Sequence, residues 1–401
     1  FQAEDGIRDS VASRGLGDVY KRQLKRGAVA VLIDLEKCKK TSVTSFYEKF
    51  KTTIPILEVK NLPKKLSLIA ARFYGAPSTK LKVTAITGTN GKTTCAHLYA
   101  NLSALYHKEV GRKNTENHCG YVGTLGHGKV TLTNEIKSDQ SADNIHISPQ
   151  LTTPDAISMQ CILDDLYSDG CDNVVLEASS HALQQHRIAN VSIDTAIFTN
   201  LSRDHLDYHG DLKTYADAKG KLFAMPGLKN AVINIDDELG KSILTKLDPA
   251  VRVITYSLEN ITADIYCQSM SFSTEGLEAY IQTPWGSGRI VSSLLGRFNL
   301  CNLLAVIASF TVNNQDIEFE NFPRILDIIS LLDPVEGRME LVRSISGPSV
   351  IVALAVLDGR KLLRTFLVST KKFTRELRSS SFLINQNHYL YLNATDTYTG
   401  R

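Results

Sequence analysis

The feature that most constrains the fold is a glycine-rich turn between an apolar run and a helical pattern. The run KVTAIT (82–87) predicts a buried strand, GTNGK a tight turn, and TTCAHLYANLSALY a helix. In such a unit, backbone N–H groups surround phosphate oxygens and the helix N-terminus adds positive potential. The loop has the short form GxxGKT, with isoleucine at position 86 where the longer pattern has glycine. We therefore predict a phosphate-binding loop, with an ordinary glycine turn as the alternative, made by Gly88, Thr89, Asn90, Gly91, Lys92, Thr93 and Thr94.

Strand and helix patterns alternate after this loop, which is typical of a doubly wound, mostly parallel α/β sheet. The stretch 261–293 instead has period-two character with glycine and proline at its turns, which predicts an antiparallel insertion. A helix is expected next, in GRFNLCNLLAVIASF. We assign residues 81–334 to this central domain, with strands at 173–179, 194–200 and 230–235 and helices at 154–168 and 212–224.

The two ends of the chain differ from its centre. Residues 1–23 resemble translated sequencing adaptor, while residues 24–80 open with a basic turn and the apolar run of a buried strand, as in the remnant of an N-terminal α/β domain. Residues 335–352 are expected to begin a C-terminal Rossmann-like domain that is largely missing. The sequence of residues 353–401 shows no ordered domain pattern and suggests a shifted reading frame near Ala353.

Composition excludes several classes of protein. The 401 residues carry 45 basic and 42 acidic side chains, so the net charge of +3 creates no single-sign field of the kind found in nucleic-acid or membrane-surface proteins. The seven cysteines have no CxxC or short disulfide spacing, which favours free thiols in a reducing compartment. No apolar run approaches the roughly 20 residues that span a bilayer. We expect a cytoplasmic protein without nucleic-acid or membrane partners.

Three further stretches carry side chains that commonly bind ligands. Glu177 and His181 follow a predicted strand, where open α/β sheets place their ligand groups, so they are a candidate metal pair. The segment 200–210, NLSRDHLDYHG, contains enough carboxylates and imidazoles to suggest zinc, although a Mg²⁺–nucleotide pocket is the preferred interpretation. In LTTPD (151–155), Pro154 suits a helix start, and the local pattern alone favours a simple N-cap.

The order of these motifs resembles that of the Mur ligase family. The matching segments are TGTNGKTT, TTPD, EASSHAL, DHLDYHG, NIDD (234–237), GRFNLCN (296–302) and GRME (337–340). The resemblance covers residues 24–352 and is dense from 81 to 340. The DYAHTPD and DNPR segments that the family carries in its C-terminal domain have no counterpart here.

The resemblance implies a role for each matching residue. ATP and Mg²⁺ are the implied cofactors, and Lys219, on a helix where a solvated surface lysine is the ordinary expectation, is implied to be carbamylated. Asn299 and Asn302 are implied to approach the adenine, whose edge needs both a donor and an acceptor. The implied catalytic residues are Lys92, Glu177, His181, Lys219 and Arg338. The implied metal ligands are Thr93, Glu177, His181 and Lys219. The implied substrate-binding residues are Thr152, Thr153, Pro154, Asp155, Ser179, Gln185 and Arg187.

The family's chemistry is ATP-dependent formation of an amide bond through an acyl phosphate. TTPD, HALQQHR and DHLDYHG are most similar to the tripeptide synthetases, which implies UDP-MurNAc-L-Ala-D-Glu and an amino acid as partners. The expected amino acid is meso-2,6-diaminopimelate, with L-lysine as the alternative because the selecting motif is absent. A folylpolyglutamate synthase-like ligase and a non-catalytic nucleotide-binding fragment are further alternatives. The protein is expected to act as a monomer.

Overall fold

A single large sheet organises the chain. The computed structural model describes residues 27–34, 55–110, 118–130, 151–314, 321–335, 338–342, 350–357 and 360–367. Within these ranges, ten strands form one sheet in the order β12-β11-β10-β9-β8-β7-β3-β6-β4-β5. The strands are β3 (Lys82–Thr87), β4 (His118–Gly123), β5 (Gly126–Val130), β6 (Cys171–Glu177), β7 (Thr195–Phe198), β8 (Asn230–Asn234), β9 (Arg252–Ser257), β10 (Ile265–Phe272), β11 (Leu277–Thr283) and β12 (Gly286–Ser292).

The strands from β10 to β4 in this order run parallel to one another, whereas β5 and the pair β11–β12 add antiparallel strands at the two edges. The doubly wound, mostly parallel α/β sheet predicted from the sequence is therefore confirmed. The antiparallel stretch expected at 261–293 is also present, but it extends the main sheet through β10 instead of forming a separate one.

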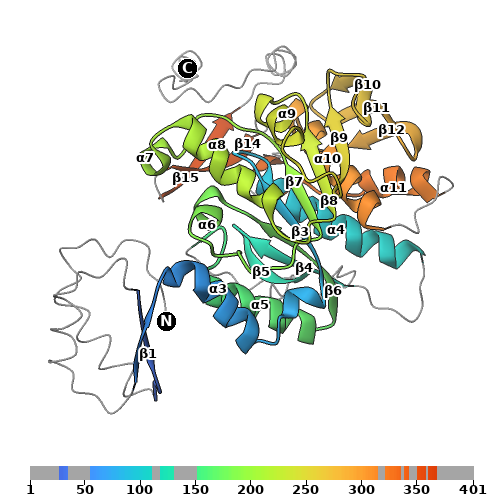
Figure 1. Cartoon of the computed structure of the whole chain (residues 1–401). Helices are drawn as coiled ribbons and strands as arrows, with labels where there is room; N and C mark the ends of the chain where they lie inside the picture. The colour runs from blue at the N-terminus through green and yellow to red at the C-terminus, as the bar shows by residue number, and fades with distance from the viewer. Residues whose placement is uncertain are drawn as a thin grey trace, which may run out of the picture.

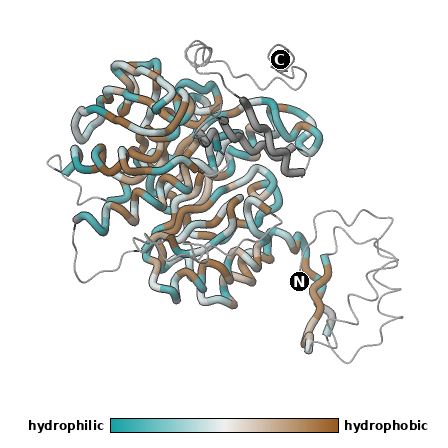
Figure 2. The backbone as a smooth tube through the Cα atoms, turned by 180° about the vertical axis from the view of Figure 1, so that it is seen from behind, coloured by the Kyte–Doolittle hydropathy of each residue, from teal (hydrophilic) through white to brown (hydrophobic). Residues whose placement is uncertain are grey.

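Helices cover both faces of this sheet (Figure 1). One face packs against α4 (Lys92–Val110), α10 (Arg297–Asn313) and α11 (Phe322–Ile329), and the other against α5 (Ala156–Ser168), α6 (Ser180–Gln184), η2 (Lys221–Ala224) and α9 (Glu238–Leu244). Successive strand residues alternate between the two cores: Ile86 of β3 enters the first and Ala85 the second. In Figure 2 the apolar residues accordingly follow the strands and the inner sides of the helices.

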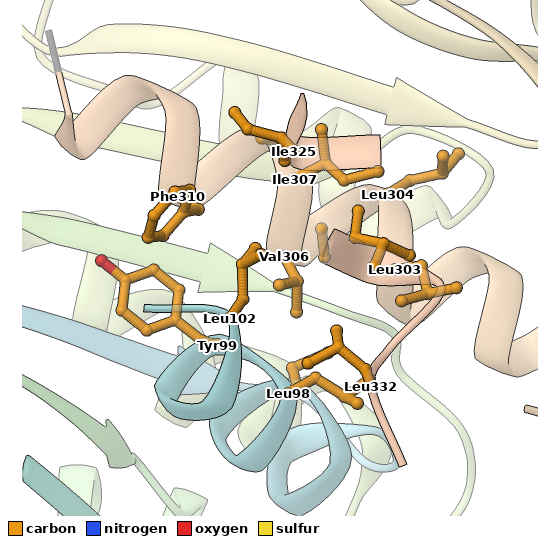
Figure 3. Packing of buried hydrophobic residues seen from close by; sticks show 14 of the residues in the cluster. Leu98, Tyr99, Leu102, Leu303, Leu304, Val306, Ile307, Phe310, Ile325 and Leu332 are labelled. Carbon is orange, nitrogen blue, oxygen red and sulfur yellow. The ribbon is translucent and has the colours of Figure 1, made fainter. Parts of the chain in front are cut away.

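The packing of α4 against α10 fixes the helix that follows the glycine-rich turn. Leu102 of α4 lies against Val306 of α10, and Leu98 of α4 lies beside Leu332, as Figure 3 shows. At the far end of the pair, the rings of Tyr99 and Phe310 meet edge to face with centroids 5.9 Å apart. Buried aromatic and aliphatic contacts of this kind anchor α4, so its N-terminus presents the turn at a fixed position.

The first described segment is a two-stranded parallel sheet followed by a helix. β1 (Val31–Asp34) pairs with β2 (Ile56–Val59), and α3 (Leu62–Phe73) leads through η1 (Pro77–Thr79) into the central sheet. The strand expected near residue 30 forms, but its four residues are only half-buried, because β1 pairs with β2 alone. α3 packs against α5, with Ser67, Ala70 and Ala71 buried.

The last described strands correct one expectation. Sequence analysis found no ordered pattern after residue 352, yet β14 (Val350–Leu357) and β15 (Arg360–Leu367) pair along eight residues and form a three-stranded antiparallel sheet with β13 (Arg338–Val342). The dipeptide Asp358-Gly359 between the two segments is a favoured hairpin turn sequence, and the segment before it, VIVALAVL, is apolar throughout, which favours a strand. Residues 1–23 and 368–401 lie outside the described residues. In the described part of the chain, no helix has the length and apolarity to cross a membrane.

Candidate nucleotide and metal site

The glycine-rich turn lies at the carboxyl end of β3, between that strand and α4. Gly88 and Gly91 have φ angles of 153° and 88°, which side-chain-bearing residues rarely adopt. A Cβ on Gly88 would lie 1.9 Å from the Thr199 hydroxyl, and one on Gly91 would lie 2.4 Å from the Asn302 side-chain oxygen. Glycine is thus required twice, because the neighbouring strand end and α10 press against the loop.

Hydrogen bonds to the end of β7 hold the turn in place. The Thr89 N–H donates to the Asn200 carbonyl oxygen at 2.8 Å, and the Asn90 N–H donates to the Asn200 side chain at 3.0 Å. The Thr199 hydroxyl donates to the Asn90 carbonyl at 2.6 Å. The loop is therefore preorganised by the parallel sheet, as a phosphate-binding loop requires.

Two lysine side chains converge on one carbonyl oxygen of the turn. Lys92 Nζ donates to the Gly88 oxygen at 2.9 Å and to the Thr89 oxygen at 2.9 Å. Lys219 Nζ, which arrives from α8 (Leu212–Gly220), donates to the same Gly88 oxygen at 2.7 Å. Neither lysine belongs to an ion pair among the described residues. The charge of Lys92, with no carboxylate paired to it among the described ion pairs, suits this turn to an anion.

Lys219 is buried, contrary to the solvated lysine that its helix position alone suggests. Its side chain is 1% exposed and its Nζ lies 4.2 Å from the centre of the Tyr215 ring. Burial lowers the pKa of Lys219 well below its usual value, and the adjacent charge of Lys92 lowers it further. Burial also lowers the pKa of Lys92, although Glu177 and Asp204 oppose that shift. Lys219 is the group whose neutral form the structure favours.

Glu177, at the end of β6, is the buried carboxylate of the site. Its Oε1 accepts hydrogen bonds from the Tyr121 hydroxyl at 2.8 Å and the Thr124 N–H at 2.7 Å. Its Oε2 accepts from the Thr93 hydroxyl at 2.9 Å and the Thr124 hydroxyl at 3.1 Å. Arg338 of β13 donates to the Thr93 hydroxyl at 3.4 Å. A carboxylate with two threonine hydroxyls is an all-oxygen donor set of the kind Mg²⁺ prefers, so these residues fit that ion.

The imidazoles form a separate cluster beside the lysines. The ring of His181 lies 4.1 Å from that of Tyr208, 4.9 Å from that of His205 and 5.5 Å from that of His209, centre to centre. Burial lowers the pKa of His205, while the charge of Asp204 opposes that shift. Its ring centre lies 6.1 Å from that of Tyr215, the residue whose ring Lys219 Nζ contacts. Across the described residues, no three His, Cys, Asp or Glu side chains are grouped to hold a metal ion, so the zinc alternative gains no support.

The residues expected on the substrate side form one hydrogen-bonded group. Thr153 donates its hydroxyl to the Glu177 carbonyl at 2.7 Å, and the Ser179 N–H donates to that hydroxyl at 3.0 Å. Arg187 donates to the Thr153 carbonyl at 2.9 Å and to the Gln185 side chain. The Thr152 hydroxyl accepts from that of Thr124 at 3.2 Å, which connects the group to the Glu177 carboxylate.

TTPD has a local structural role as well. Asp155 is the N-cap of α5, where its side chain accepts from the N–H groups of Ile157 and Ser158. The helix begins at Ala156, so Pro154 precedes the cap and is not the first helical residue as the sequence suggested. The simple N-cap that local sequence favoured is present at Asp155.

Asn299 and Asn302 are buried at the start of α10, beside the loop. Asn299 donates to the Leu295 carbonyl at 2.8 Å, and Asn302 donates to the Asn299 side chain at 3.3 Å. The Asn302 oxygen is also the atom that a side chain at Gly91 would strike. These amides therefore support the loop itself, and their approach to adenine remains a prediction.

Three residues of the site were not predicted from the sequence: Tyr121, Thr124 and Thr199. Tyr121 and Thr124 belong to YVGT, which reads as an ordinary apolar strand and turn, and only the pairing of β4 with β6 brings them to Glu177. Thr199 follows β7, and its N–H donates to the Thr87 carbonyl at the end of β3 at 3.0 Å. The signal that could have found them is their position after buried strands that end at the same edge of a parallel sheet.

Comparison with known proteins decides the family. The family description "Mur ligase middle domain" matches residues 86–310, more than half of the chain. The chain belongs to the Mur ligase family. The family resemblance drawn from the motifs is confirmed.

Among the relatives of this Mur ligase is a UDP-N-acetylmuramoyl-L-alanyl-D-glutamate–2,6-diaminopimelate ligase of Pseudomonas syringae pv. tomato, 39% identical over 333 residues, which are 83% of this chain and 61% of the relative. A solved structure of a ligase of that name has a TM-score of 0.62 and 28% identity, covering 79% of this chain and 62% of its own. The folylpolyglutamate synthase of Mycobacterium tuberculosis, at TM-score 0.53 and 16% identity over 79% of this chain and 70% of its own, shares the fold. The chain spans about three fifths of the length of the relative named first.

Proposed function

We propose that this Mur ligase forms an amide bond between meso-2,6-diaminopimelate and UDP-N-acetylmuramoyl-L-alanyl-D-glutamate, with ATP as the energy source. The observation that carries the proposal is the convergence of Lys92 and Lys219 on the Gly88 oxygen, at the carboxyl edge of the sheet. The 39% identity to a ligase of that name supports the choice of substrates.

The reaction needs activation because a free carboxylate is a poor electrophile. In the proposed sequence, an oxygen of the D-glutamate side-chain carboxylate attacks the γ-phosphorus of ATP, the bond to the bridging oxygen breaks, and ADP leaves. The amine of the incoming amino acid then attacks the acyl carbon, loses a proton and displaces phosphate. Lys92, Arg338 and the loop N–H groups stabilise the charge on the transferred phosphoryl group, and that stabilisation supplies most of the catalysis expected for phosphoryl transfer.

Thr93 and Glu177 are the residues proposed to hold Mg²⁺, together with His181 and Lys219 as the family resemblance implies. A bound magnesium ion supplies positive charge that neutralises the phosphate oxygens. The Thr93 hydroxyl already contacts both the carboxylate of Glu177 and the guanidinium of Arg338.

Lys219 is proposed to carry a carbamate. The neutral amine attacks the carbon of CO₂ and loses a proton, which turns a buried neutral group into an anion beside the Lys92 ammonium. Burial and a lowered pKa favour the neutral, nucleophilic amine that this step requires.

The substrate side is proposed to comprise Thr152, Thr153, Pro154, Asp155, Ser179, Gln185 and Arg187, and the adenine side Asn299 and Asn302. Hydrogen bonds join Thr153 to the backbone that carries Glu177, so a substrate carboxylate bound there lies near the phosphate loop. We further propose that the protein acts as a monomer in the cytoplasm.

The direct test is an ADP-release assay on the purified chain with ATP, Mg²⁺, UDP-N-acetylmuramoyl-L-alanyl-D-glutamate and either meso-2,6-diaminopimelate or L-lysine. We expect ADP release that requires both the nucleotide-sugar dipeptide and diaminopimelate, with the tripeptide product detected by mass spectrometry. Turnover with L-lysine alone contradicts the choice of amino acid. ADP release driven by a folate, or none with either amino acid, contradicts the proposed function.

A further inference from the structure

The two oxygens of the Glu177 carboxylate lie in different surroundings. Oε1 is bound by a phenol hydroxyl and a backbone N–H, from Tyr121 and Thr124. Oε2 lies against two threonine hydroxyls, which are oxygen atoms of the kind that Mg²⁺ takes as ligands. One oxygen is thus anchored to β4 and its following turn, and the other faces the Thr93 side of the site.

Tyr121 has the rigidity that an anchor requires. Its side chain is 0% exposed and belongs to the core cluster beneath α4. Its hydroxyl oxygen accepts a hydrogen bond from the Leu125 N–H at 3.3 Å, which leaves the hydroxyl proton directed to Glu177.

Gly123 keeps the space in which the phenol and the carboxylate meet. A Cβ at this position would lie 2.3 Å from Glu177 Oε1 and 2.4 Å from the Tyr121 hydroxyl oxygen. Both distances are far below van der Waals contact, so any side chain here displaces one group or the other. The strand β4 therefore contributes two features to the same contact, a buried phenol and a glycine two residues later.

We propose that Tyr121 is a positioning residue that fixes the rotamer of Glu177, so that the carboxylate presents Oε2 to a divalent cation bound with the nucleotide. This inference rests on the proposed function, because it assumes that Glu177 serves a metal–nucleotide complex. Partners of metal ligands in their outer shell commonly affect metal affinity by 10- to 100-fold.

The test is the affinity for Mn²⁺, measured by electron paramagnetic resonance on the full chain with a non-hydrolysable ATP analogue. We expect Tyr121→Phe to weaken Mn²⁺ binding about tenfold and to leave the affinity for the metal-free analogue unchanged. The matched control is Tyr99→Phe, since Tyr99 is equally buried in the same core and its hydroxyl accepts from Asn313 at 2.8 Å. That variant should bind Mn²⁺ as the wild type does.

The outcomes separate this inference from the proposed function. If the wild-type protein binds the analogue with the same affinity whether or not Mn²⁺ is present, the proposed function is contradicted. A wild type with normal Mn²⁺ binding that Tyr121→Phe retains, or an equal loss in Tyr99→Phe, overturns the role of Tyr121 and leaves the function standing. Should Tyr121→Phe fail to fold, Gly123→Ala reaches the same carboxylate, and unchanged Mn²⁺ affinity in that variant also overturns the inference.

Discussion

Two buried polar clusters lie at opposite ends of the same strands, and they are built differently. At the amino end of β3 and β7, Asn313 of α10 donates to Thr84 and Tyr99 at 2.8 Å each and accepts from Thr195 at 2.5 Å. At the carboxyl end, Lys92 and Lys219 share one carbonyl oxygen. The side chains of the first cluster are an amide and three hydroxyls, none of which carries a charge. They form their hydrogen bonds with one another inside the fold.

The difference indicates which cluster serves stability and which serves binding. A buried polar group that finds its partners inside the protein contributes to a unique core. Two buried lysines in contact with one neutral oxygen instead cost stability, because burial disfavours the charged form of each amine. Of these two clusters, the one with the electrostatic cost is therefore the one at the end of the sheet where the glycine-rich turn lies.

The largest effect is expected from Lys92→Ala. Removing the ammonium that contacts the loop should lower ligation at least 1000-fold, on the order of 4 kcal/mol, because it takes away charge stabilisation of the transferred phosphoryl group. Circular dichroism should show an unchanged fold. The matched control is Lys229→Ala, which removes a lysine that is 71% exposed and paired with Asp194, and it should leave ligation unchanged. Full turnover in the Lys92 variant contradicts the assignment of the loop.

Asn313→Leu should affect stability alone. Thr84, Tyr99 and Thr195 lose their shared partner, so the free energy of unfolding should fall by about 3 kcal/mol, as measured by urea denaturation. ATP affinity, measured on the folded variant, should stay within twofold of wild type. A clear loss of ATP affinity shows that the two clusters are coupled and breaks the comparison.

Lys219→Met should raise stability by about 2 kcal/mol in bicarbonate-free buffer at neutral pH, since an apolar side chain replaces a buried amine. The folded chain holds the pKa of Lys219 below its unfolded value near 10.5, so the unfolded state binds the extra proton between those two pKa values. Wild-type stability therefore rises with pH through that window, and the advantage of the variant should shrink as pH approaches 10.5. Thermal denaturation across pH measures this, and a constant or growing advantage refutes it.

Much of the central fold was predictable from sequence, because its strands are short apolar runs bounded by turns. The residue types of GTNGK predict the loop, and the apolar pattern of KVTAIT predicts β3. Lys219 was found through family resemblance, since its helix pattern alone gives no sign of burial. Tyr121 was not found at all, because its role depends on the pairing of β4 with β6, which no local pattern encodes.

The ends of the chain show a second limit. The prediction for residues after 352 rested on the absence of an ordered domain pattern and of the family motifs, while β14 and β15 form through local hairpin pairing that needs neither. Pro154 was given the first helical position, but Asp155 takes the cap, because its carboxylate satisfies two N–H groups at once.

The most direct test is calorimetric titration of ATP into the folded chain, with and without Mg²⁺, for wild type, Lys92→Ala and Asn313→Leu. Convergence of Lys92 and Lys219 on the loop predicts magnesium-dependent binding to wild type and to the Asn313 variant, and a loss of at least tenfold in the Lys92 variant. No magnesium-dependent binding to wild type, or equal binding by all three chains, contradicts the claim that the turn carrying Lys92 forms the triphosphate site.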